Sequence, residues 1–209
     1  MGIPVLILGE SGSGKSASLR NFSPDEVAVF NVASKPLPFR GSLPKMDGCS
    51  YEGIKTALGK AKKKTFVIDD AQYLMAFSSF SRAKETGYGK FTDFALDYYN
   101  LIKFIVEDTA PDVIVYILQH SERSEDGHIK VKTIGKMLDN QLTVEGLFSI
   151  VLMCRTDGTR HYFETQSDGF TTAKSPMGMF DLEIDNDLKL VDKTIREYWE
   201  LGGKNGEAK

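Results

Sequence analysis

The chain contains 209 residues, carries a formal net charge of −3 and is 41% hydrophobic, which is typical of one soluble globular domain, with or without a small appendage. This balance argues against a stand-alone DNA-binding protein, so any contact with nucleic acid would be a local patch. The two cysteines, Cys49 and Cys154, lie too far apart for a zinc site or a disulfide framework, and no apolar stretch approaches membrane-spanning length. We expect a cytoplasmic protein without a membrane partner.

Short apolar strands alternate with amphipathic helices along the chain. The apolar runs predict strands over residues 3–8, 26–32, 65–69 and 112–119. The helical spacing of apolar residues predicts helices over residues 15–22, 51–61, 91–106 and 188–199. Alternation of this kind, with continuous apolar strands, is typical of a parallel sheet covered by helices on both faces. The sequence therefore predicts an α/β fold with a mostly parallel sheet.

A hairpin is expected near the end of the predicted sheet. An Asp-Gly pair at 157–158 joins apolar runs over 149–155 and 160–165, and this turn pair predicts an antiparallel edge. Two long segments, 76–90 and 121–140, contain Gly, Ser and charges without a regular pattern. Segments of this kind in compact domains are typically functional or mobile loops.

The stretch after the first predicted strand fully matches the pattern GxxxxGK[ST]. Its glycines let the backbone turn so that several N–H groups point at one centre, and the helix expected next adds its positive N-terminal end. Lys15 would reach the β- and γ-phosphates of a nucleotide, and the Ser16 hydroxyl would coordinate Mg²⁺. We predict that one continuous run binds the nucleotide: Gly9, Glu10, Ser11, Gly12, Ser13, Gly14, Lys15, Ser16 and Ala17.

Polar residues at the ends of two other strands would complete the site. Asp69 ends the apolar run 65–69 and is the expected Walker B ligand of Mg²⁺, with a turn aspartate as the alternative. Asp70 follows it and would either orient the attacking water or cap the next helix. Gln119 ends the fourth predicted strand, where it would either sense the γ-phosphate or satisfy loop backbone groups. His120 is expected to be structural.

Together these residues resemble the RecA-like branch of P-loop ATPases, in particular the small phage recombination ATPases of the Sak4 type. The resemblance rests on GESGSGKS, FVIDD, YILQHSE, TIGKMLDN and TTAKSPMGMFD. It implies a RecA-like core over residues 1–183, followed by a C-terminal helix and tail over 184–209. It also implies an oligomeric ATPase that uses ATP and Mg²⁺ and acts on single-stranded DNA in recombination or annealing. The resemblance further implies a phage-infected bacterial cell, with a single-strand binding protein as a conceivable partner.

The chain departs from this family at one functional position. RecA-like enzymes generally place a catalytic glutamate at the end of the second strand, where this chain reads Asn31-Val32-Ala33-Ser34. The residue that activates water is therefore left open. The acidic pair Asp69-Asp70 also leaves open an AAA+-like alternative, in which the second acid would be glutamate.

The resemblance also implies a DNA contact and a cation donated between subunits. DNA-contacting loops of RecA-like proteins occupy the place of residues 121–140, which here include several basic side chains: Arg123, His128, Lys130, Lys132 and Lys136. Acids are interleaved with them, so a solvated loop is the alternative. Lys174 is the expected cation donated to a neighbour's γ-phosphate, with Arg160 as its substitute and an ordinary surface lysine as the alternative.

Two other functions compete with this interpretation. A P-loop nucleotide or metabolite kinase needs clustered arginines that clamp the transferred phosphoryl group, whereas Arg155 and Arg160 are the only near pair in the sequence. A non-hydrolysing loader or accessory module would use its nucleotide only to order a surface. The missing strand-end glutamate favours this second alternative.

Overall fold

A single mixed sheet organises the chain in the computed structural model, which describes residues 1–60, 62–87, 89–134 and 142–202. The described strands follow the spatial order β3-β2-β4-β5-β1-β7-β8-β9, and β6 pairs with β5 outside this path. Their bounds are β1 Ile3–Gly9, β2 Val27–Asn31, β3 Lys45–Asp47, β4 Thr65–Asp69, β5 Ile114–Arg123, β6 Ile129–Val131, β7 Ile150–Thr156, β8 His161–Glu164 and β9 Glu183–Asp185.

The six strands from β3 to β7 in this order run parallel, and β8 and β9 close one edge in antiparallel fashion. This arrangement confirms the predicted α/β fold with a mostly parallel sheet and an antiparallel edge hairpin. The register places Gly9 beside His120, and Asn31 beside Asp69. The carboxyl ends of β1, β2, β4 and β5 therefore meet at one edge of the sheet, where ligands bind in open α/β sheets.

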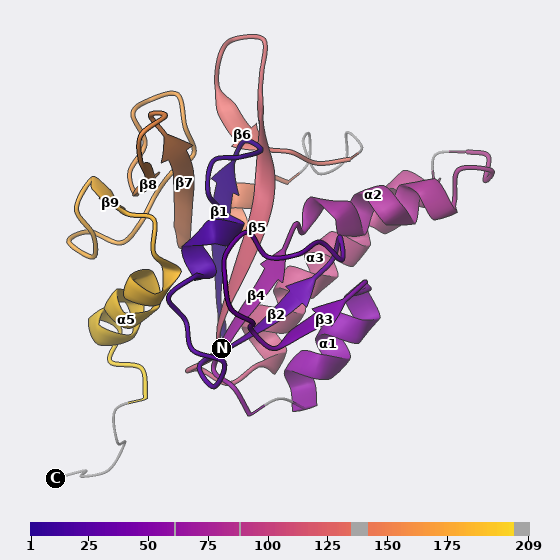
Figure 1. The fold of residues 1–209 in the computed structure, drawn as a ribbon. Coiled ribbons are helices and arrows are strands. Elements are labelled where there is room, and N and C mark those ends of the chain that lie inside the picture. Colours follow the sequence, from indigo (N-terminus) through magenta and orange to yellow (C-terminus); the bar gives the residue numbers. More distant parts are fainter. Residues whose placement is uncertain (61, 88, 135–141, 203–209) are drawn as a thin grey trace, which may run out of the picture.

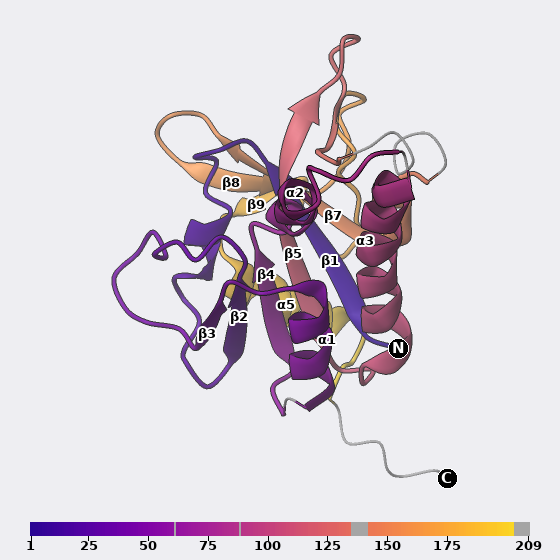
Figure 2. The ribbon, with the colours of Figure 1, turned by 90° about the vertical axis from the view of Figure 1, so that its right-hand side faces the viewer.

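Helices cover both faces of the sheet, as Figures 1 and 2 show. The four described α-helices are α1 Tyr51–Lys60, α2 Gln72–Ser81, α3 Gly89–Asp108 and α5 Leu188–Tyr198, with short 3₁₀ turns η1 Ser16–Leu19 and η2 Val144–Leu147. The first three helices pack on one face, while η1 and α5 pack on the other. None of the described helices combines the length and apolar character needed to cross a bilayer.

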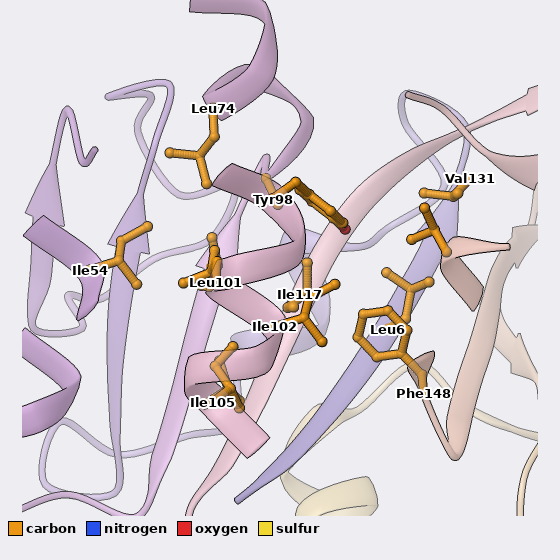
Figure 3. Packing of buried hydrophobic residues seen from close by; sticks show 14 of the residues in the cluster. Leu6, Ile54, Leu74, Tyr98, Leu101, Ile102, Ile105, Ile117, Val131 and Phe148 are labelled. Carbon is orange, nitrogen blue, oxygen red and sulfur yellow. The ribbon is translucent and has the colours of Figure 1, made fainter. Parts of the chain in front are cut away.

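Strand β1 shows why the sheet needs cover on both sides. Successive side chains of a strand point to opposite faces, so Leu6 and Leu8 join the cluster under α1 and α3, whereas Val5 and Ile7 join the cluster under α5. Figure 3 shows residues of α3, including Leu101 and Ile105, directed toward the strands. Burial on both faces explains the continuous apolar runs in the sequence.

The helix predicted over residues 15–22 is the clearest error. Only η1 forms there, a single 3₁₀ turn. Of the two buried apolar residues of this segment, Leu19 lies in the turn and Phe22 lies beyond it, and Pro24 disfavours helical geometry at Ser23, so the segment does not continue as a helix.

Both segments predicted to be irregular contain regular structure. Helix α2 continues to Ser81 and α3 begins at Gly89, since buried Leu74 and Met75 anchor a helix that then extends beyond the core. In the other segment, β5 continues to Arg123 and pairs with β6 as an antiparallel hairpin. This hairpin projects beyond the rest of the sheet in Figure 1.

The C-terminal helix α5 is an integral part of the core. Leu188, Val191 and Ile195 are almost completely buried against the sheet. Asp187 caps the helix by accepting a hydrogen bond from the backbone N–H of Lys189 at 2.9 Å. The domain boundary expected after residue 183 stays a prediction, and residues 203–209 of the expected tail lie outside the described residues.

Candidate functional site

The loop between β1 and η1 has a backbone that only glycine adopts easily. Gly12 and Gly14 have φ values of +82° and +103°, a region where a Cβ is strained. Gly9 has a different reason: a Cβ there would lie 2.5 Å from Ser13 Oγ and 2.7 Å from the carbonyl oxygen of Cys154. The spacing of glycines in the motif thus reflects backbone twist at two positions and close packing at the third.

Lys15 is held at the centre of this loop. Its side chain is buried, and Nζ donates hydrogen bonds of 2.8 Å to the carbonyl oxygens of Gly9 and Glu10. Burial lowers the pKa of Lys15, because the charged form loses hydration. An ammonium has three N–H donors, so a phosphate oxygen could take the remaining one without disturbing the loop.

Ser16 and Asp69 meet although they are far apart in the sequence. The Ser16 hydroxyl donates to Asp69 Oδ1 at 2.8 Å, across the ends of β1 and β4, which are separated in the sheet only by β5. Burial raises the pKa of Asp69, and the Ser16 hydrogen bond opposes that effect. A hydroxyl and a carboxylate side by side suit Mg²⁺, which is usually bound by one or two protein oxygens with waters and phosphates. Among the described residues, neither this site nor any other has a group of three or more His, Cys, Asp or Glu side chains arranged to hold a metal.

Asp70 faces the same pocket from an unusual backbone conformation. Its φ is +60°, a left-handed value that costs energy for a residue other than glycine. The carboxylate forms an ion pair with Lys35 and lies 3.6 Å from Nε2 of His120. Burial raises the pKa of Asp70, but the contacts with His120 and Lys35 outweigh burial, so the net pKa falls below its ordinary value.

The helix-cap alternative for Asp70 is wrong. Ala71 is the N-cap residue of α2, and its cap has no side-chain hydrogen bond. The Asp70 carbonyl oxygen, not its carboxylate, accepts the hydrogen bond from the backbone of Tyr73 at 3.0 Å. The carboxylate is therefore available to the pocket.

Gln119 is directed away from the phosphate loop. Its Oε1 accepts a 2.6 Å hydrogen bond from the Tyr98 hydroxyl, and its Nε2 donates to the carbonyl oxygen of Lys132 at 2.8 Å. Gln119 and Tyr98 are both completely buried, and Figure 3 shows Tyr98 extending from α3 toward β5. The sensor role of Gln119 stays a prediction, but both the oxygen and the nitrogen of its amide are hydrogen-bonded in this structure. His120, the next residue, points to the other face and lines the pocket instead.

The pocket above the loop has a volume of about 390 Å³. Residues from five segments line it: Ser11, Gly12, Gly14, Lys15, Ser16, Ala17, Lys35, Pro38, Asp70, His120 and His161. Sequence reasoning missed the contributions of Lys35 and His161. His161 Nδ1 lies 2.8 Å from the Ser13 carbonyl oxygen, and a Cβ at Gly14 would lie 2.9 Å from its ring. For His161, the predicted hairpin was the one feature of the sequence that could have indicated this position, because its second strand returns toward the loop between β1 and η1.

Neither expected intersubunit cation lines this pocket. The backbone of Lys174 exchanges hydrogen bonds of 2.8 and 2.9 Å with Val151 of β7. Val151 pairs with Leu6 of β1, three residues before Gly9. Arg160 contacts Asp157 and Glu183 at 3.2 and 2.8 Å. A role in a second subunit stays a prediction for both residues.

The predicted DNA-contacting segment forms the β5–β6 hairpin. Lys130 lies 3.4 Å from Glu122, and His128 lies 3.9 Å from Asp126, so the interleaved acids contact the basic residues. Arg123 instead lines a second cavity of about 220 Å³, which it shares with Glu10 and Ser11 of the phosphate loop. Lys136 and residues 135–140 of the predicted segment lie outside the described residues.

Comparison with known proteins adds no assignment: no protein-family model matches this chain, and no curated protein matches its sequence.

Proposed function

We propose that this chain binds ATP with Mg²⁺ and hydrolyses it to ADP and phosphate. The observation that carries this proposal is the 2.8 Å contact between Ser16 and Asp69 beside Lys15. The motif alone specifies Lys15 and Ser16. The fold independently brings a buried strand-end carboxylate to the Ser16 hydroxyl, which is the pairing that a phosphate-bound Mg²⁺ requires.

The loop and the polar residues beside it have distinct roles in this proposal. Backbone N–H groups of the loop would bind the phosphates, and Lys15 would contact the β- and γ-phosphates. Ser16 and Asp69 would hold Mg²⁺, the Asp through water. When bound, Mg²⁺ neutralises charge on the phosphate oxygens.

Asp70 is the residue that we assign to the attacking water. The water oxygen forms a bond to the γ-phosphorus while the bond from that phosphorus to the β–γ bridging oxygen breaks, and the water's proton passes to the Asp70 carboxylate. ADP keeps the bridging oxygen, and phosphate leaves. Support for this assignment comes from the strained φ of Asp70 and from its contact with His120, which place its carboxylate in the pocket.

We further propose that the protein is a RecA-like oligomeric ATPase that acts on single-stranded DNA in phage-type recombination. The sheet order supports a RecA-like fold, because β5 lies between the phosphate-loop strand and the Asp69 strand. The hairpin supports a DNA contact that affects hydrolysis, because Arg123 shares a cavity with Glu10 and Ser11. DNA held on the hairpin would therefore lie next to the phosphate loop.

An ATPase assay with and without Mg²⁺ and single-stranded DNA tests the proposal. We expect Mg²⁺-dependent turnover that DNA stimulates, and its loss in Lys15→Ala. Lys103→Ala is the matched control, because it removes a lysine paired with Glu107 on α3, outside the pocket. Turnover that requires a small phosphoryl acceptor would favour a kinase, and binding without turnover would favour an accessory module.

A further inference from the structure

Lys35 is a second cation in the phosphate pocket. It follows β2, and its side chain is 56% exposed where it pairs with Asp70. Its Nζ also lies 5.4 Å from the centre of the Tyr73 ring, a distance at which a cation is attracted to the ring face. Lys35 and Lys15 line the same cavity.

Buried Asn31 explains how this lysine is positioned. Asn31 is only 1% exposed, and its Nδ2 donates to the carbonyl oxygen of Lys35 at 2.8 Å and to Asp47. Between the two residues, Ser34 takes a left-handed φ of +55° and donates its N–H to the Asn31 carbonyl oxygen. The chain thus turns sharply at the end of β2 and is fixed there. At the position where RecA-like enzymes place a glutamate, this chain uses an amide that anchors a lysine.

The charges of the pocket are balanced before any ligand arrives. Lys15 and Lys35 face Asp69 and Asp70, and each acid already has a polar partner. A triphosphate would add several negative charges to this space. Lys35 is the cation that can change partner, because its side chain is 56% exposed although Asp70 is buried, whereas Lys15 is buried and bonded to the loop.

We propose that Lys35 contacts the terminal phosphate of ATP bound to its own subunit, and that it leaves its ion pair with Asp70 to make this contact. The inference rests on the proposed function. Once Lys35 moves, Asp70 keeps His120 as its neighbour and loses its contact with the lysine. Only a triphosphate provides the group that draws Lys35 away, so ADP leaves the ion pair intact.

The test compares ATP and ADP affinities, measured with Mg²⁺ by titration calorimetry on wild-type protein, Lys35→Ala and Lys64→Ala. Lys64 is the matched control, because its side chain is also about half exposed and paired with an aspartate, Asp112, and it lies outside the pocket. We expect Lys35→Ala to weaken ATP binding roughly 10- to 100-fold, the effect of one charge-assisted hydrogen bond. The ADP affinity of Lys35→Ala should stay within about twofold, as should both affinities of Lys64→Ala. Lys35→Arg should recover part of the ATP affinity.

The possible results separate this inference from the proposed function. If wild-type protein binds neither nucleotide, the proposed function fails. If wild type binds both, and Lys35→Ala changes ATP and ADP affinity equally or not at all, the phosphate contact of Lys35 is refuted while the ATPase assignment stands. Thermal unfolding of each variant verifies that the fold is intact, and Lys35→Gln provides a second neutral variant if the alanine variant does not fold.

Discussion

The hydrogen bond between Tyr98 and Gln119 offers a direct test of what Gln119 does. Changing Tyr98→Phe removes one hydroxyl and leaves the shape of the core unchanged. Burial raises the pKa of the Tyr98 phenol, so that hydroxyl keeps its proton and is a donor at every working pH. In the variant, Gln119 Oε1 loses its 2.6 Å partner at a site with no solvent exposure.

The expected loss of stability follows from that burial. Leaving a buried acceptor unsatisfied costs about 1–3 kcal/mol. A loss of about 2 kcal/mol in a domain of this size corresponds to a Tm lowered by roughly 4–8 °C. Because Gln119 contacts α3 and the Lys132 backbone rather than the phosphate pocket, ATP affinity and turnover should change by less than about twofold below the Tm.

Urea unfolding and a steady-state ATPase assay would be run on the same samples, with Tyr99→Phe as the control. Tyr99 is the next residue of α3 and is 37% exposed, so its hydroxyl can be replaced by water and its removal should leave stability unchanged. A Tyr98→Phe variant that unfolds like wild type but hydrolyses ATP at least tenfold more slowly would refute the structural role and return Gln119 to the phosphate site.

Other changes probe the rest of the site. Asp69→Asn should abolish Mg²⁺-dependent turnover, whereas Asp70→Asn should lower kcat by about 10²–10⁴; normal turnover in either variant would contradict its role. If the hairpin binds DNA, affinity for single strands should fall steeply with rising salt. A variant with alanine at Lys130, Lys132 and Lys136 should flatten that slope. An unchanged slope would place DNA elsewhere. If Lys174 acts on a neighbouring subunit, Lys174→Ala should bind ATP but hydrolyse it poorly, and mixing it with Lys15→Ala should restore part of the activity. Strictly monomeric protein with concentration-independent turnover would exclude that role.

The parts of the site that could be predicted are those encoded locally. A glycine-rich turn between a strand and a lysine predicts the loop that we propose binds phosphate, because its backbone conformation and side-chain chemistry depend on consecutive residues. Asp69 could be found because it ends an apolar run. The contact between Ser16 and Asp69 needed one further assumption, that the two strand ends share one edge, and the observed parallel sheet satisfies it.

What could not be predicted depends on tertiary placement. Lys35 occupies the pocket because β2 lies beside β4 and because Asn31 anchors the turn, and neither relation is visible in the spacing of residues. Gln119 and His120 are adjacent in sequence, so pattern alone could not decide which of them faces the loop. The helix expected over residues 15–22 from apolar spacing is wrong for a related reason, since Leu19 and Phe22 are buried by a single 3₁₀ turn and the residues that follow it.

The anchoring of the phosphate loop has a consequence for the order in which the chain acquires its shape. The Ser13 carbonyl oxygen contacts the thiol of Cys154 at 3.0 Å and the ring of His161 at 2.8 Å, and β1 itself lies between β5 and β7. A motif that ends at Ser16 is thus supported by segments that are synthesised more than 130 residues later. A nascent chain halted before residue 150 would carry the whole motif without these anchors, and we expect it not to retain nucleotide.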